Sequence, residues 1–206
     1  MQNDFCDPDG LFAQSGMDVT ALQELIPHLA EFVRAARNAG VMVLHTQNTT
    51  LPGGASDSPA WVRTKAMACK DPEYTLDGSW GQAFCPSMEP GKNEPVIKKN
   101  RSSGFVDTNM DLVLRSNGIE SLLVTGCLSD GCVLATANHA RFLNYYVVVA
   151  GDCIGSTNQG RHAAALKLLN PIDSSELLEA WAGSEPSDGH LTRQKAPAIM
   201  SKPSTR

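Results

Sequence analysis

The stretch from Leu122 to Ala140, LLVTGCLSDGCVLATANHA, decides how the rest of the chain is interpreted. It opens with an apolar run typical of a buried strand, turns at Gly126, and passes from Cys132 into an alanine-rich segment typical of a helix. Cys132 is therefore expected at a strand-to-helix turn. Unpaired N–H groups and the positive end of the helix dipole favour a thiolate there, and the thiolate is the nucleophilic form. A small buried cysteine at a helix start is the alternative interpretation.

Strands and helices alternate on both sides of this stretch. The expected elements, in order, are a helix over residues 18–38, a strand over 41–44, a strand starting at 96, a helix over 108–117, the strand and helix of the central stretch, a strand over 145–150, a turn at 151–153 and a helix over 158–169. This alternation predicts an α/β fold, a three-layer doubly wound parallel sheet with helices on both faces. Ligands bind such sheets beyond the carboxyl ends of the strands.

Composition narrows the class of partner. The chain has 206 residues, a formal net charge of −5 and no block of Lys and Arg, which argues against nucleic acid and anionic membranes and favours a small-molecule substrate. No signal-peptide pattern occurs, and no apolar run approaches the roughly 20 residues that cross a membrane, so we expect a cytoplasmic protein. The 6 cysteines form no CxxC pair, so neither a zinc site nor a disulfide framework is expected.

The chain is expected to form one domain. We assign residues 1–182 to it, and residues 183–206, rich in Ser, Pro and charge, to a disordered tail. A long segment that carries several aromatic residues runs from the end of the first expected strand to about residue 95. We interpret this segment as an ordered cover over a pocket rather than as a flexible insertion.

Four segments together resemble the isochorismatase-like cysteine hydrolases. They are QNDF at residues 2–5, Lys99 followed by Ser103-Gly104-Phe105, VTGCLSDGCV at residues 124–133, and Asp152 after a β-branched run. Their order and spacing are compatible with that family from residue 1 to about residue 180. Within it, GSWG at residues 78–81 is most similar to the ureidoacrylate amidohydrolase, biuret hydrolase and carbamoylsarcosine hydrolase branches.

The resemblance implies a Cys-Lys-Asp catalytic set. In this set Cys132 attacks an amide or ureido carbonyl, and the charge of Lys99 stabilises the thiolate. The family also implies a cis peptide bond between Cys127 and Leu128, and an oxyanion hole formed by the N–H groups of Leu128 and Cys132. The expected substrate-binding residues are Gln47, Asn48, Trp80 and Phe105.

The third member of the set falls outside the sequence. In the family, the general base is an aspartate at the end of the first strand, immediately before the residue that matches Met1. The resemblance therefore predicts a sheet that lacks its first strand. Asp4 is the nearby carboxylate that could replace the base, although we interpret it primarily as a structural residue of the QNDF loop.

These observations predict a cofactor-independent cysteine hydrolase. It would cleave a C–N bond of a small amide, carbamoyl or ureido compound through an acyl-enzyme. The alternatives are an isochorismatase-type hydrolase and a catalytically impaired, truncated homologue that serves as a binding or assembly subunit. No metal is expected, because the segment after His45 lacks the further histidines that nicotinamidases use. By analogy with the family, we expect a homo-oligomer.

Overall fold

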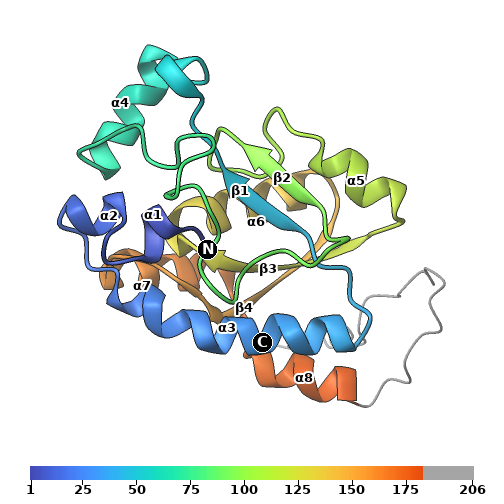
Figure 1. The fold of residues 1–206 in the computed structure, drawn as a ribbon. Helices are drawn as coiled ribbons and strands as arrows, with labels where there is room; N and C mark the ends of the chain where they lie inside the picture. The colour runs from blue at the N-terminus through green and yellow to red at the C-terminus, as the bar shows by residue number, and fades with distance from the viewer. Residues whose placement is uncertain (183–206) are drawn as a thin grey trace.

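The computed structural model describes residues 1–182 and contains two pairs of parallel strands. In one pair β1 (His45–Asn48) lies beside β2 (Val96–Lys99), and in the other β3 (Ser121–Cys127) lies beside β4 (Tyr146–Gly155). Figure 1 shows β1 and β3 as the inner strands and β2 and β4 as the outer ones.

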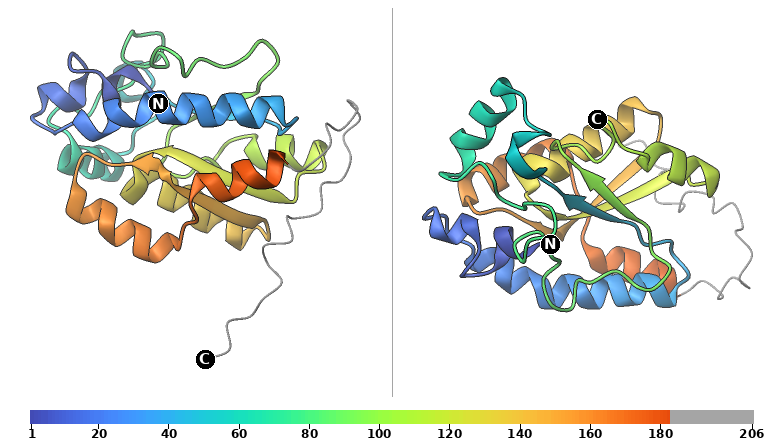
Figure 2. Two further views of the ribbon diagram at one scale, coloured as in Figure 1. Left: turned by 90° about the horizontal axis from the view of Figure 1, so that it is seen from below. Right: turned by 45° about the horizontal axis from the view of Figure 1, so that its top comes forward.

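Helices cover both faces of these strands. They are α1 (Asn3–Cys6), α2 (Leu11–Gln14), α3 (Thr20–Asn38), α4 (Pro59–Ala68), α5 (Met110–Ser116), α6 (Leu134–Phe142), α7 (Gln159–Leu169) and α8 (Ser174–Ala182), with short helical turns η1 (Pro52–Gly54) and η2 (Ser129–Val133). Figure 2 shows α3 on one side of the strands and α7 on the other. Helices on both sides of parallel strands form the three-layer α/β architecture predicted from the sequence.

Helix α3 shows how the sequence produces this packing. Its buried residues recur every three or four positions and form one apolar stripe, at Leu22, Leu25, Leu29, Phe32 and Ala36. All of this stripe except Ala36 packs into a hydrophobic cluster that includes Phe5 and Phe12 of the amino-terminal turns and Ala150 of β4. The stripe therefore fixes α3 across one face of the strands, close to the start of the chain.

Two expected boundaries were wrong. Residues 41–44, which were expected to form a strand, are not in one: β1 begins at His45, where pairing with Val96 of β2 begins. The expected turn at 151–153 lies inside β4, which continues to Gly155 through an irregularity in its pairing with β3. Apolar runs indicate where a strand can form, whereas the partner decides where pairing starts and ends.

Other elements agree with the sequence patterns. The strand starting at Val96, the helix that ends before Gly118 and the strand leading to Cys127 are all present. Helix α7 begins after Asn158, whose side chain accepts a hydrogen bond from the Arg161 N–H as an N-cap. No helix within residues 1–182 has both the length and the apolar character needed to cross a bilayer. The predicted tail, residues 183–206, lies outside the described residues.

Candidate active site

The structure brings Cys132 and Lys99 together. Cys132 lies in η2, between β3 and α6, and Lys99 is the last residue of β2. The Lys99 Nζ lies 3.2 Å from the Cys132 Sγ. Lys99 is only 3% exposed, whereas Cys132 is half-buried and open to a pocket. The contact places a buried cationic side chain directly against the sulfur of a cysteine at a pocket wall.

Asn48 and a main-chain carbonyl hold the Lys99 ammonium in place. Its Nζ donates to the Asn48 Oδ1 at 3.3 Å and to the Arg101 carbonyl oxygen at 3.0 Å. Together with the Cys132 Sγ, these acceptors account for all three ammonium hydrogens. Asn48 is the strand partner of Lys99 in the β1–β2 register, so the ends of both strands fix the geometry.

The turn that carries Cys132 is tied to the elements around it. The peptide bond between Cys127 and Leu128 is cis. The Leu128 carbonyl accepts hydrogen bonds from the N–H groups of Gly131 and Val133, at 3.0 and 3.1 Å. Within residues 1–182, the Leu128 N–H has no hydrogen-bond acceptor. This N–H is therefore free to donate to a ligand beside Cys132.

Two side-chain contacts fix the same turn from the carboxyl end of β4 and from α7. The Ser129 Oγ lies 2.9 Å from the His162 Nδ1, and the Ser156 hydroxyl donates to the Asp130 Oδ1 at 2.6 Å. Ser129 is fully buried. These contacts hold the loop on both sides of Cys132, which keeps the thiol in a defined position relative to Lys99.

A small pocket opens beside the thiol. Its volume is about 130 Å³, and its walls are largely apolar and aromatic. The lining residues are Phe5, Phe12, Asn48, Trp61, Thr64, Lys65, Tyr74, Ser102, Cys127, Leu128, Gly131 and Cys132. Apolar walls with a few polar groups around a nucleophile are typical of small-molecule sites.

The expected cover segment is ordered and forms part of this pocket. Helix α4 presents Trp61 and Lys65, one helical turn apart, to the pocket. The Lys65 Nζ donates to the Asp57 Oδ2 and the Thr50 Oγ1, both at 2.8 Å, and lies 4.7 Å from the centre of the Tyr74 ring. Burial, followed by the nearby charge of Cys132, raises the pKa of Tyr74. The cover is therefore anchored by a buried ion pair next to the site.

Asp4 occupies a structural position. Its carboxylate oxygens accept hydrogen bonds from the Leu11 N–H, at 3.2 Å, and from the Thr75 N–H. Asp4 is 5% exposed, and there is no room for a side chain at Gly81 because the Asp4 carboxylate packs against its backbone. These contacts connect α1 to α2 and to the cover segment.

The expected substrate-binding residues are dispersed. Asn48 lines the pocket, but its amide oxygen is bound to Lys99. The side chain of Gln47 donates to the Gln82 carbonyl at 3.1 Å, and Trp80 is 54% exposed outside the pocket lining. Phe105 is buried in a core cluster against Tyr145. Of these four side chains, only Asn48 contributes to the wall of the pocket beside Cys132.

Sequence reasoning missed several wall residues. Trp61 is one of the aromatic residues of the cover segment from which the sequence predicts a pocket, but its direction could not be predicted, and Thr64 and Lys65 were not recognised at all. The spacing of these three residues places them on one face of α4. That spacing is the sequence pattern from which their common direction could have been predicted. Tyr74 carries no comparable signal, because an irregular segment has no periodicity from which to predict its direction.

Within residues 1–182, the side chains that could hold a metal do not line the pocket beside Cys132. His28, Asp152 and Cys153 have potential ligand atoms within 4.8 Å of one another. The Asp152 carboxylate already accepts hydrogen bonds from His28 and from the N–H of Ser174 at the start of α8, so these contacts join α3, β4 and α8. His45 is paired instead with Glu94, at 2.8 Å, and burial lowers its pKa.

Comparison with known proteins gives a consistent result. The model of the isochorismatase domain family matches residues 1–176. The ureidoacrylate amidohydrolase RutB of Yersinia enterocolitica is 33% identical over 162 residues, covering 74% of this chain and 70% of the relative. RutB of Klebsiella pneumoniae is 28% identical over 212 aligned positions, covering 98% of this chain and 88% of the relative.

Solved structures share the fold. An isochorismatase-like hydrolase from Alkaliphilus metalliredigens superimposes with a TM-score of 0.74 at 24% identity, covering 88% of this chain and 94% of its own. A cysteine hydrolase from Pseudomonas syringae pv. phaseolicola gives a TM-score of 0.76 at 18% identity, and the alignment covers 88% of this chain and 89% of the hydrolase. At these identities the likeness establishes a common architecture.

Proposed function

The chain belongs to the isochorismatase family and is a hydrolase of that family, and we propose that it cleaves a C–N bond of a small amide, carbamoyl or ureido compound with Cys132 as nucleophile. The observation that carries the proposal is the 3.2 Å contact between the Lys99 Nζ and the Cys132 Sγ, beside a pocket of about 130 Å³. A buried lysine that contacts a cysteine at a pocket wall is suited to nucleophilic catalysis.

The proposed reaction begins with attack of the Cys132 thiolate on the substrate carbonyl carbon. The carbonyl oxygen becomes an oxyanion, which in this proposal the N–H groups of Leu128 and Cys132 stabilise. The C–N bond then breaks, and we assign the proton for the departing nitrogen to Lys99, whose Nζ contacts the Cys132 Sγ. Water attacks the resulting thioester and returns a proton to Lys99, the C–S bond breaks, and the acid leaves with the Cys132 thiolate restored.

The pocket walls constrain the substrate. Trp61 and Tyr74 offer flat apolar surfaces, whereas Ser102 supplies a polar group. A compact, planar ureido or carbamoyl compound fits this combination better than a peptide does. The names of the RutB relatives make ureidoacrylate the first compound to test.

The experiment is a measurement of ammonia release from a panel of ureido, carbamoyl and simple amide compounds. The wild-type chain is compared with Cys132→Ala and with Cys153→Ala, a control that removes a buried thiol outside the lining of this pocket. We expect release by the wild type and the control and none by Cys132→Ala. Release by Cys132→Ala would refute the nucleophile, and the absence of release from every compound by the wild type would refute the activity.

A further inference from the structure

Tyr74 is a wall residue of the pocket beside Cys132 and carries a hydroxyl group. Within residues 1–182 this hydroxyl has no hydrogen-bond partner. It is not sealed inside the protein either, because the Ser121 Oγ is the enclosed side-chain atom without a partner in the described part of the chain. The Tyr74 hydroxyl is therefore accessible and can bind a ligand.

Most other polar side chains of this pocket are already engaged. Three lining residues use their side-chain polar atoms in hydrogen bonds within the protein: Asn48, Thr64 and Lys65. The Ser102 hydroxyl and the Leu128 N–H have no partner in the part of the chain that the structure describes. In the proposed mechanism the Leu128 N–H binds the oxygen of the attacked carbonyl. The hydroxyl groups of Tyr74 and Ser102 are left for the rest of a substrate.

The Tyr74 side chain is held from several sides. Its main-chain carbonyl accepts hydrogen bonds from the Thr50 Oγ1 at 2.8 Å and from the Thr75 Oγ1 at 2.7 Å. Its ring packs edge-on against the rings of Phe5 and Phe12, with centres 5.7 and 5.3 Å away. These contacts restrict both the backbone and the ring, so the hydroxyl has a fixed position relative to the pocket.

The residue after Tyr74 adopts a strained backbone conformation. Thr75 is β-branched, yet its φ is +56°, in the left-handed region that such residues avoid. The Thr75 N–H donates to the Asp4 carboxylate, and the Thr75 carbonyl accepts from the Thr50 N–H at 2.9 Å. Strain of this kind persists where surrounding contacts enforce it, and it is concentrated at ligand sites. The strained turn sets the direction in which the chain presents Tyr74.

The hydroxyl is a hydrogen-bond donor at neutral pH. Burial, followed by the nearby charge of Cys132, raises the pKa of Tyr74 above its ordinary value, so the proton stays on the phenol. A protonated phenol next to a nucleophile can donate to an oxygen of the substrate.

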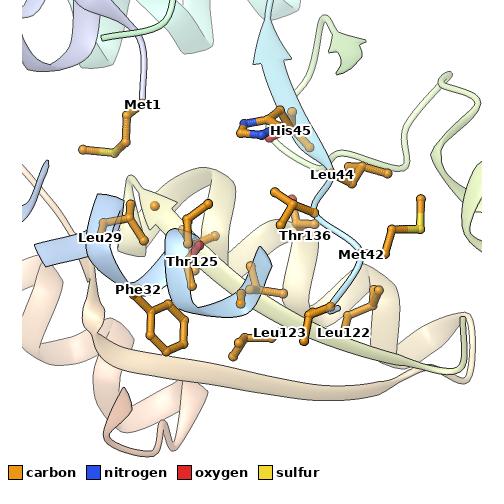
Figure 3. Close-up of a pocket in the computed structure, with 18 of the residues that line it drawn as sticks. Met1, Leu29, Phe32, Met42, Leu44, His45, Leu122, Leu123, Thr125 and Thr136 are labelled. Carbon is orange, nitrogen blue, oxygen red and sulfur yellow. The ribbon is translucent and has the colours of Figure 1, made fainter. Parts of the chain in front are cut away.

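Cys132 also lines a second cavity, of about 270 Å³, between residues 41–46 and β3 (Figure 3). Tyr74 and Ser102 are absent from the lining of that larger cavity and belong to the smaller pocket alone. A compound that contacts both the Cys132 sulfur and the Tyr74 hydroxyl must therefore lie in the smaller pocket. Dependence on Tyr74 distinguishes the two cavities.

We propose that the Tyr74 hydroxyl donates a hydrogen bond to a second oxygen of the substrate, other than the oxygen of the carbonyl that Cys132 attacks. This role rests on the proposed function and makes Tyr74 a specificity-determining residue. An apolar substituent at the same place would displace water from the hydroxyl without replacing its hydrogen bond, which is unfavourable. Tyr74 therefore selects amides that carry a further oxygen acceptor over amides of similar shape that lack one.

The test labels Cys132 with two electrophiles of similar shape. Chloroacetylurea has a second carbonyl, whereas N-isopropyl-2-chloroacetamide has an apolar isopropyl group in its place. In both reactions the thiolate displaces chloride and forms a stable S–C bond, so no hydrolysis is needed. Labelling rates at Cys132 are measured by peptide mass spectrometry and divided by the rates with free cysteine, which corrects for intrinsic reactivity.

The full chain is compared with Tyr74→Phe and with Tyr146→Phe, a control at an exposed tyrosine outside the pocket. We expect the wild type and the control to prefer chloroacetylurea by about tenfold, the effect of one hydrogen bond. Tyr74→Phe keeps the ring and should lose this preference, while its rate with the isopropyl compound stays unchanged.

Several results would overturn the proposal. They are a preference that persists in Tyr74→Phe, the absence of a preference in the wild type, and the absence of labelling at Cys132 by either compound. An equal fall with both compounds in Tyr74→Phe would show that the hydroxyl acts on the thiolate and not on the second oxygen. A preference that depends on Tyr74, without ammonia release from any compound, would support this binding role and refute only the hydrolytic activity.

Discussion

Lys99 shows how individual side chains define the site. Its ammonium has three acceptors, and one of them, the Asn48 Oδ1, comes from a residue that the sequence suggested as a substrate contact. The Asn48 Nδ2 also donates to the Thr75 Oγ1 at 2.7 Å. In the proposed mechanism Asn48 therefore acts through Lys99, by fixing the direction of the ammonium toward Cys132.

Asn48→Ala is expected to weaken catalysis without removing either member of the Cys132–Lys99 pair. Loss of a hydrogen bond to a charged group costs about 1.5–3 kcal/mol, which corresponds to a fall in kcat/KM of roughly 10- to 100-fold. The check is steady-state kinetics on a substrate found in the ammonia assay, with Asn117→Ala, at the far end of α5, as the control. An unchanged kcat/KM in Asn48→Ala would contradict the positioning role.

Glu94 gives a pH-dependent prediction. Its carboxylate receives Arg37 at 2.6 and 2.8 Å, the Gly91 N–H at 2.8 Å and His45 at 2.8 Å. These contacts, with Arg37 the largest cause, lower the pKa of Glu94 from 4.5 to about 2. Because the folded-state pKa is depressed, the stabilisation is complete above about pH 4.5 and is lost as the pH falls toward 2.

Glu94→Gln should therefore lower the free energy of unfolding by about 1–2 kcal/mol at pH 7 and by less at pH 3. Urea unfolding at both pH values checks this, with the exposed Glu89→Gln as the matched control. An equal loss at both pH values would mean that packing, rather than the carboxylate charge, accounts for the effect.

At the scale of elements, α4 and the cover segment depend on one buried ion pair. The side chains of Lys65 and Asp57 are 2% and 5% exposed. Lys65→Met would leave the Asp57 carboxylate buried without its cation, which costs about 3–5 kcal/mol in comparable cases. Adding Asp57→Asn removes the uncompensated charge and should recover part of that loss.

The measurement is a double-mutant cycle by chemical denaturation, combined with limited proteolysis of the cover segment. We expect Lys65→Met to unfold at lower denaturant and to be cleaved faster between residues 50 and 70, with partial recovery in the double variant. Additive effects of the two substitutions would show that the pair does not act as a unit.

Elements whose residues carry a recognisable local pattern, such as apolar spacing or a capping residue, were predictable from the sequence. Helix α3 follows from its apolar spacing and α7 from its N-cap at Asn158. Residues 41–44 have the composition of a strand, but they have no partner in the described part of the chain and are therefore not part of β1. The bulge in β4 depends on pairing with β3, which an apolar run does not encode.

At the scale of the whole molecule, the fold brings the ends of parallel strands together. The carboxyl ends of β1 and β2 supply Asn48 and Lys99, and the turn after β3 supplies Cys132. The position of Cys132 at a strand-to-helix turn could be predicted from the sequence pattern, whereas Lys99 was assigned to the same site only by the resemblance to the family; the ends of parallel strands share one edge, where both residues lie. The aromatic wall could not be predicted, because Trp61 and Tyr74 reach the pocket through the tertiary path of the cover segment.

The central claim is that Cys132 forms a covalent acyl intermediate next to Lys99. The most direct measurement is intact-protein mass spectrometry after acid quench of the reaction with an active ureido or amide substrate, followed by peptide mapping. The account predicts an adduct equal to the substrate minus its leaving amine, located on Cys132 and absent from Cys132→Ala. The same adduct in Cys132→Ala, or turnover by that variant, would contradict it.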